Sequence, residues 1–357
     1  MTLVLAAVAL GALAWVLRLP GRVVIALYLA LWVAAILAHL VLPEGHAIRG
    51  AIGGDARTWG ALGVAAALAL GYRWGLGALR ARARPAPVAQ QPPVPAAAAA
   101  GDRLGDDELD RYARHIVLRE IGGTGQRRLK AARVLVIGAG GLGSPALLYL
   151  AAAGIGRITI VDDDRVSVSN LQRQILFTTA DAGQSKAGVA AARLAALNPH
   201  VAVEALGERL DEANAAALVA GHDLILDGSD NFDTRYLANR AAVAAGVPLI
   251  SAAITQWEGQ IGLYDPARGG ACYQCLFPER PAPGLAPACA EAGVVGPLPG
   301  VMGSLMALEA VKQITGAGQG LRGYLLILDA LWGETRRIAT GPRVGCPVCG
   351  HLQATGG

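Results

Sequence analysis

A glycine-rich turn is the first feature of the sequence that could do chemistry. The apolar run 133–137 is predicted to be a strand, and the residues from Ser144 onward are predicted to be a helix. Between them lie glycines that would let backbone amides approach phosphate oxygens at the positive end of the helix: Gly138, Gly140, Gly141 and Gly143. Asp162 ends the next predicted strand, at about the 20-residue spacing that suits a ribose hydroxyl. The pattern predicts an adenosine-type nucleotide site, and by itself it also permits a nicotinamide-dependent dehydrogenase.

Polar residues after Asp162 could contact the phosphates of this nucleotide: Asn170, Arg173, Gln174 and Lys186. An Arg guanidinium and a Lys ammonium are the donors that would neutralise a triphosphate in a phosphoryl or nucleotidyl transfer. A solvated surface position is the alternative for Arg173. Lys186 is unusual because the chain is rich in arginine, and the two side chains are not interchangeable at a phosphate. We therefore expect Arg173 and Lys186 to act in catalysis, and Asn170 and Gln174 to bind the nucleotide.

A second acidic segment follows the predicted buried strand that begins at Leu224. It carries Asp227, Asp230 and Asn231. Ligands of open parallel sheets lie outside the carboxyl ends of the strands, so Asp230 is placed to hold Mg²⁺ against phosphate, with Asn231 in the same site. Asp227 could merely cap the turn, and capping of the helix that begins near Phe232 is the alternative for Asp230.

The five cysteines suggest a metal site and one separate thiol. Cys272 and Cys275 form one C-x-x-C pair and Cys346 and Cys349 form another, which suits a structural Zn²⁺ held by four thiolates in a reducing compartment. Redox dithiols are the alternative. Cys289 stands alone in a segment rich in Pro, Ala and Gly. It is either a small apolar residue or a nucleophile that traps an acyl or persulfide intermediate, although no His lies beside it in the sequence.

These motifs in combination resemble the sulfur-carrier adenylyltransferases of the ThiF/MoeB type, which are relatives of the ubiquitin-activating enzymes. Within that family the molybdopterin-synthase adenylyltransferases are the nearest match. The residues that carry the resemblance are Arg111–His115, the glycine turn, Asp162, Ser169–Gln174, Lys186, Asp230, Asn231, Trp257–Gln260, the two cysteine pairs and Glu291–Val294.

The resemblance implies a reaction. ATP and the C-terminal Gly-Gly carboxylate of a ubiquitin-like sulfur carrier, in molybdopterin or thiamine-thiazole synthesis, would give an acyl-adenylate and pyrophosphate. By the family's pattern Arg114 reaches the phosphates of the neighbouring subunit in a homodimer, while Arg173, Lys186 and Asp230 act in their own subunit. Two alternatives stay open. One is the nicotinamide-dependent oxidoreductase, and the other is a membrane scaffold that binds nucleotide without turnover.

The elements that must position these residues begin after residue 100. Short β-branched runs alternate there with Ala- and Leu-rich helical stretches. This alternation predicts an α/β domain over 101–357, with a Rossmann-like, mixed but mainly parallel sheet and helices on both faces. The net charge of +4 is small and no run of five basic residues occurs, which argues against a nucleic-acid partner.

The first 84 residues are different. The whole chain of 357 residues is 54% hydrophobic and 16% charged, more apolar than a soluble average. Apolar runs at 3–17, 23–42 and 59–79 approach or reach the ~20 residues that a membrane-spanning helix needs, and Arg73 interrupts the third. We expect two or three transmembrane helices over 1–84, followed by a Pro/Ala-rich linker over 85–100.

The arginines predict the orientation of these helices. They crowd the first short loop and the segment after the third run: Arg18, Arg22, Arg80, Arg82 and Arg84. The positive-inside rule then puts the N-terminus outside if there are three spans, and two spans would reverse it. The expectation is a multi-pass protein of the inner (cytoplasmic) membrane with a cytoplasmic catalytic domain.

Overall fold

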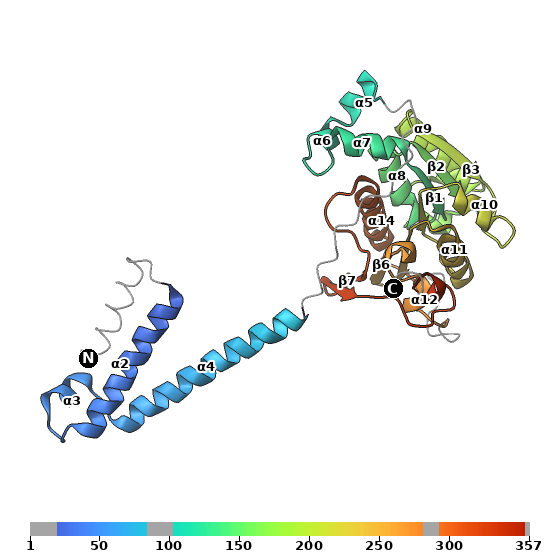
Figure 1. Cartoon of the computed structure of the whole chain (residues 1–357). Coiled ribbons are helices and arrows are strands. Elements are labelled where there is room, and N and C mark those ends of the chain that lie inside the picture. Colours follow the sequence, from blue (N-terminus) through green and yellow to red (C-terminus); the bar gives the residue numbers. More distant parts are fainter. Residues whose placement is uncertain (1–19, 84–102, 281–292, 354–357) are drawn as a thin grey trace. The chain divides into compact units, whose positions relative to one another are not determined.

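The computed structural model describes residues 20–83, 103–280 and 293–353, and the chain divides into two compact units, Met1–Pro87 and Val88–Gly357. The predicted run at 3–17, the linker at 85–100 and Cys289 lie outside the described residues. Each unit has its own helices, which Figure 1 labels.

The N-terminal unit contains α2 (Gly21–Val41), α3 (Ala47–Ile52) and α4 (Ala56–Ala83). The indole N–H of Trp32 on α2 donates to the carbonyl oxygen of Trp59 on α4 at 2.8 Å, which joins the two long helices. Among the described residues, Val23–Val41 and Ala56–Leu79 are long and apolar enough to cross a bilayer, by length and composition. Their large apolar side chains are mostly exposed.

The C-terminal unit is built on an eight-stranded sheet with the order β3-β2-β1-β4-β5-β6-β7-β8. The first five strands in this order pair in parallel, and the last three join antiparallel. The prediction of a mixed, mainly parallel Rossmann-like sheet is therefore confirmed. The strands are β1 (Arg133–Ile137), β2 (Arg157–Val161), β3 (Ala202–Leu206), β4 (Leu224–Asp227), β5 (Leu249–Thr255), β6 (Glu258–Tyr264), β7 (Tyr324–Asp329) and β8 (Glu334–Ala339).

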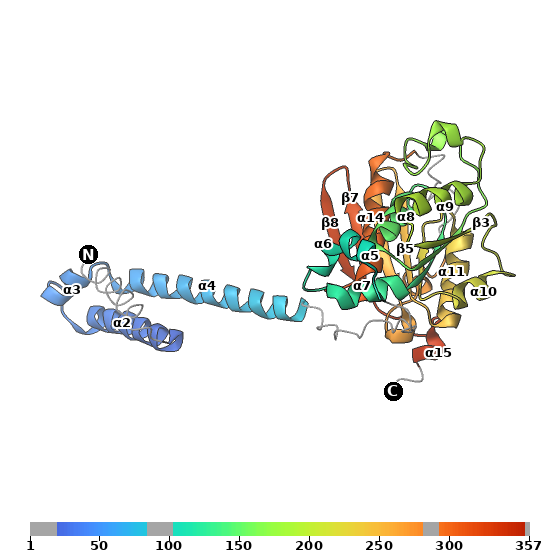
Figure 2. The same cartoon turned by 90° about the horizontal axis from the view of Figure 1, so that it is seen from above.

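Helices cover both faces of the central strands of this sheet (Figure 2). The α-helices are α5 (Asp106–Arg111), α6 (Ala113–Ile116), α7 (Gly122–Ala131), α8 (Gly143–Ala153), α9 (Lys186–Leu197), α10 (Ala215–Ala220), α11 (Phe232–Ala245), α12 (Tyr273–Leu276), α14 (Pro297–Thr315) and α15 (Gly350–Gln353). Short 3-10 helices are η1 (Val168–Asn170), η2 (Thr179–Asp181) and η3 (Pro266–Arg268).

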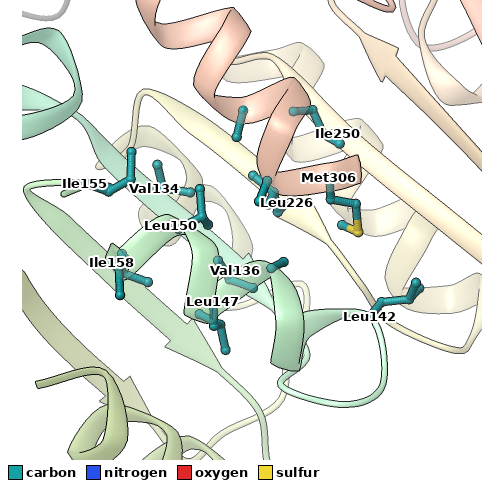
Figure 3. Close-up of a cluster of buried hydrophobic side chains, with 14 of the residues drawn as sticks. Val134, Val136, Leu142, Leu147, Leu150, Ile155, Ile158, Leu226, Ile250 and Met306 are labelled. Carbon is teal, nitrogen blue, oxygen red and sulfur yellow. The ribbon is translucent and has the colours of Figure 1, made fainter. Parts of the chain in front are cut away.

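Alternate residues of the central strands pack into two separate hydrophobic cores, one on each face of the sheet. Val134 and Val136 of β1 pack with α8, α9 and α14, and Figure 3 shows this cluster with Leu147 and Leu150 of α8 pointing toward the sheet. Leu135 of β1 packs instead with α10 and α11 on the opposite face. Successive strand side chains point to opposite faces, so a strand buried on both faces must be apolar throughout. Burial of one leucine of this kind contributes about 2 kcal/mol, before the entropy cost of ordering it.

Candidate active site

A cavity of about 760 Å³ lies at the carboxyl ends of the parallel strands. Its walls come from the segments that follow β1, β2, β3 and β4, and from the ends of β5 and β6 that face them. The residues predicted from the sequence that line it are Gly138, Gly140, Gly141, Asp162, Arg173, Gln174, Lys186, Asp230 and Asn231. The structure thus brings together side chains that lie far apart in the chain.

The glycine turn closes tightly between β1 and α8. Gly138 has φ of 86°, a left-handed conformation that favours glycine. A Cβ on Gly143 would lie 1.9 Å from the carbonyl oxygen of Gly138, so no other residue fits there. Gly143 therefore supports the turn and is not among the residues that line the cavity. Ser144 and Ala146 of α8 donate their N–H groups to the carbonyl oxygens of Gly140 and Leu142. Donors to an anion would therefore come from the turn itself, where Gly140, Gly141 and Leu142 line the cavity.

Asp162, at the end of β2, is tied to this turn. Its Oδ2 accepts from the backbone N–H of Ala139 at 2.7 Å, and its Oδ1 accepts from the N–H of Asp164 at 2.9 Å. Burial raises the pKa of the Asp162 carboxyl, and the two backbone donors and Lys186 oppose that rise. The end of β2 is therefore fixed against the turn that follows β1, in the position predicted for a ribose hydroxyl.

Arg173 and Gln174 enter the cavity together after η1. Arg173 donates from Nη2 to Asn170 Oδ1 at 2.8 Å. Asn170 does not itself line the cavity, so in this structure it orients the guanidinium of Arg173 and not the ligand. Gln174 is 4% exposed, and its Oε1 accepts no hydrogen bond from any residue that the structure describes. That oxygen is a buried acceptor on the cavity wall, suited to a ligand donor.

Lys186 begins α9 with its side chain 4% exposed. Its Nζ lies 2.7 Å from Asp164 Oδ2, and its backbone N–H donates to the carbonyl oxygen of Asp164. A buried ammonium needs such a partner, because an unpaired charge in the interior is costly. Asp164 is not among the residues predicted from the sequence. The available signal was a second carboxylate two residues after Asp162, on the same strand end.

Asp230 and Asn231 have different roles in the structure. Asn231 caps α11, because its Oδ1 accepts from the backbone N–H of Thr234 at 2.9 Å. The capping alternative for Asp230 is therefore wrong. Asp230 is exposed to the cavity and makes no hydrogen bond or ion pair with the described part of the chain. Asp227, as the sequence allowed, caps the turn after β4 through Ser229.

The structure adds two arginines to the cavity wall. Arg235 of α11 and Arg280, which follows α12, both line it, and neither was among the predicted residues. Arg235 is 7% exposed, whereas Arg280 pairs with Asp233 near the rim. Arg235 could have been predicted as a cavity residue, because it lies about one helical turn after Asp230 and Asn231. Arg114, by contrast, is exposed on α6 and is not part of the cavity of its own chain.

The four paired cysteines form one cluster. Their sulfur atoms lie within 4.8 Å of one another, and Cys272 Sγ is 3.7 Å from Cys275 Sγ and 3.6 Å from Cys346 Sγ. Four thiolates around a tetrahedral Zn²⁺ with Zn–S of about 2.3 Å would be about 3.8 Å apart, while a disulfide needs about 2 Å. The donor set and its spacing therefore fit Zn²⁺ and do not fit disulfides.

The thiols of this cluster are buried, and burial raises the pKa of Cys272 and brings that of Cys349 to about 11. Burial also opposes ionisation of Cys346, but backbone N–H donors of Cys349 and Val348 outweigh it and bring its pKa to about 7. A divalent cation would supply the missing stabilisation of the thiolates.

Comparison with known proteins identifies the family. The model of the ThiF family matches residues 112–348. The chain belongs to the ThiF family. Over 252 residues it is 53% identical to the sulfur carrier protein adenylyltransferase of Thermus thermophilus, covering 70% of this chain and 93% of that protein. Over 250 residues it is 49% identical to the SAMP-activating enzyme E1 of Haloferax volcanii, covering 70% and 91%.

Other ThiF relatives are longer than the region that matches. The chain is 51% identical over 238 residues to the probable adenylyltransferase/sulfurtransferase MoeZ of Mycobacterium tuberculosis, and it spans only 61% of that protein. A crystal structure of E. coli MccB with AMPCPP and MccA superimposes with a TM-score of 0.59 at 26% identity, covering 68% of this chain and 74% of MccB. The C-terminal unit therefore shares its fold with E. coli MccB.

We predict that the purified protein contains about one zinc ion per chain, bound by the cysteine cluster. Chelation should lower its melting temperature, because the thiolates lose the ion that links the segment at Cys272 to the segment at Cys346. Elemental analysis and thermal unfolding measure both effects. Cys346→Ser should lose zinc, whereas Cys289→Ser, the matched control, should retain it. Full zinc content in Cys346→Ser would contradict the assignment.

Proposed function

We propose that this protein uses ATP to adenylate the C-terminal Gly-Gly carboxylate of a ubiquitin-like sulfur carrier, in molybdopterin or thiamine-thiazole synthesis. The observation that carries the proposal is the convergence of Arg173, Lys186 and Asp230 on one cavity, beside a phosphate-binding turn, in a chain of the ThiF family. Its relatives in Thermus thermophilus and Haloferax volcanii are named for the activation of such carriers, which supports this activity and does not favour the nicotinamide alternative.

In the proposed reaction a carrier carboxylate oxygen attacks the α-phosphorus of ATP. The new O–P bond forms as the bond between the α-phosphorus and the bridging oxygen breaks, and that oxygen leaves with pyrophosphate. Both reactants are anions, so cations in the cavity must offset their repulsion. At 4 Å and an effective dielectric constant of 20, one pair of opposite unit charges is worth about 4 kcal/mol. Only the part of this attraction that is stronger in the transition state than in the bound ground state speeds the reaction.

We assign the roles as follows. The amides of the turn after β1 bind phosphate, and Asp162 binds the ribose. Arg173, oriented by Asn170, and Lys186 stabilise charge on the phosphates. Asp164 is the resting partner of the Lys186 ammonium, and a triphosphate would compete with it for Lys186. Asp230 would hold Mg²⁺, which brings ATP as its metal complex, and the cysteine cluster would hold Zn²⁺.

The carrier tail would approach from the side of β5 and β6. Ala253, Thr255 and Gln260 line that side of the cavity. A tail that ends in two glycines has no side chains at its end, so it would fit through a narrow channel to the α-phosphate.

We further propose a homodimer in which Arg114 serves the partner's cavity. The supporting observation is that α8 and α14, which pack against each other, both carry exposed apolar side chains: Tyr149 is 58%, Val301 47% and Leu308 52% exposed. A partner subunit would cover such side chains.

The N-terminal helices are proposed to anchor the enzyme in the inner membrane as a multi-pass segment, with residues 85–100 as a tether and residues 101–357 in the cytoplasm. Two apolar helices of sufficient length support this. A cytoplasmic location is also consistent with a cluster of free thiols.

Lys186→Ala should lower carrier-dependent ATP–pyrophosphate exchange by about 100- to 1,000-fold, because it removes a buried cation from the transferring phosphates. Exchange of labelled pyrophosphate into ATP measures the effect. Lys312→Ala is the matched control, since Lys312 lies on α14 and is not part of the cavity wall. Exchange at the wild-type rate in Lys186→Ala would remove the proposed mechanism.

The full-length protein should stay with the membrane fraction after an alkaline carbonate wash. Val33→Arg, near the centre of α2, should release a measurable share of it, because an arginine there costs about 3 kcal/mol of insertion free energy. Leu308→Arg on α14 carries the same charge and should not change retention. Complete release of the unmodified protein would show that the helices are not anchored in a bilayer.

A further inference from the structure

The carboxylate of Asp227 is completely buried at the end of β4, yet it does not face the cavity as a ligand. It accepts three hydrogen bonds. Two come from Ser229, from its backbone N–H at 3.0 Å and its hydroxyl at 2.5 Å, and the third comes from the Ser251 hydroxyl of β5 at 2.8 Å. These donors compensate for a buried charge that would otherwise be costly.

The remaining polar group of Ser229 is held from the other side. Arg235 of α11, itself buried, donates from Nη2 to the carbonyl oxygen of Ser229 at 2.6 Å. The N–H and the hydroxyl of Ser229 therefore each donate to an acceptor, and its carbonyl oxygen accepts from a donor. The backbone N–H of Gly228 donates to the carbonyl oxygen of Ile137, which ties the same turn to β1.

Asp230 follows directly, and it is the exception in this segment. Ser229, the residue before it, is hydrogen-bonded to Asp227 and Arg235. Asn231, the residue after it, caps α11. Its own carboxylate faces the cavity and contacts no hydrogen-bond donor in the regions that the structure describes. A ligand group is most effective when its support is rigid and its own oxygens stay available.

We propose that Asp227, Ser229 and Arg235 are positioning residues that fix the Asp230 carboxylate for the metal ion of the nucleotide. The inference rests on the proposed function, in which Asp230 holds Mg²⁺. The hydrogen bonds around Ser229 hold the Asp230 carboxylate in place. Their removal should therefore lower the affinity for the metal ion more than it lowers the stability of the fold.

The chain offers a matched pair of variants for the test. Ser229→Ala and Ser251→Ala each remove one hydroxyl from the same buried carboxylate, but only Ser229 belongs to the turn that carries Asp230. Both should lower the melting temperature by similar amounts. Ser229→Ala alone should weaken binding of the Mn²⁺ complex of α,β-methylene-ATP, followed by electron paramagnetic resonance, by about ten-fold. Equal effects on Mn²⁺ binding in the two variants, or none in Ser229→Ala, would overturn the inference.

Substitutions of Arg235 separate positioning from direct contact with ATP. Arg235→Met should raise the Mg²⁺ concentration needed for half-maximal exchange and leave the KM for ATP unchanged at saturating Mg²⁺, and Arg235→Lys should restore part of the loss. A raised KM for ATP with an unchanged Mg²⁺ requirement would mean that Arg235 touches the nucleotide, which contradicts a positioning role.

The variant Asp230→Asn distinguishes a failure of this inference from a failure of the proposed function. If it leaves Mn²⁺ binding unchanged, Asp230 is not the metal ligand and the proposed function loses that role together with the inference. If it weakens Mn²⁺ binding while Ser229→Ala does not, only the positioning role is lost. In the Asp230→Asn background, Ser229→Ala should add nothing to the loss of Mn²⁺ affinity.

Discussion

The parallel pairing of β1 with β2 and β4 is the constraint on which the rest of the structure depends. Ile137 lies opposite Val161 on one side and opposite Asp227 on the other, so three strands end at one edge. The turn after β1, the carboxylate after β2 and the acidic segment after β4 then meet around one cavity. Strands buried on both faces set this register, because a slip would move their side chains between the two cores.

Charge is arranged around that edge in compensated pairs. Lys186 is buried against Asp164, and Asp227 is buried against hydroxyl and amide donors. Asp230 and the Oε1 of Gln174 remain without a partner among the described residues. The turn at Asp227 needs little reorganisation when a triphosphate enters, because its donors already hold its geometry, whereas Lys186 would have to exchange Asp164 for phosphate.

Part of this site could be predicted from the sequence because several of its groups stand where a predicted strand ends. The glycine turn, Asp162 and Asp230 follow strands that sequence patterns find readily, and parallel strands bring their ends together. The sulfur cluster could also be predicted, because paired cysteines at this spacing have few other uses. The mainly parallel sheet followed from alternation of β-branched and helical segments.

The partners of these groups could not be predicted. That Asn170 orients Arg173, that Asn231 and not Asp230 caps α11, and that Arg235 binds the Ser229 carbonyl all depend on side-chain directions after the chain has folded. Sequence spacing places a residue on an element, but it does not say which neighbour its side chain meets. Arg114 shows the same limit, because its predicted role lies in a second subunit.

The central claim is that the grouped cations and the bound metal ion allow a terminal carboxylate to attack the α-phosphorus of ATP. The most direct measurement is the intact mass of a Gly-Gly carrier after incubation with the protein, ATP and Mg²⁺ and in the presence of pyrophosphatase. The account predicts a carrier heavier by one AMP, with the adduct at its last residue. ATP consumed to ADP and phosphate, with the carrier unmodified, would contradict it.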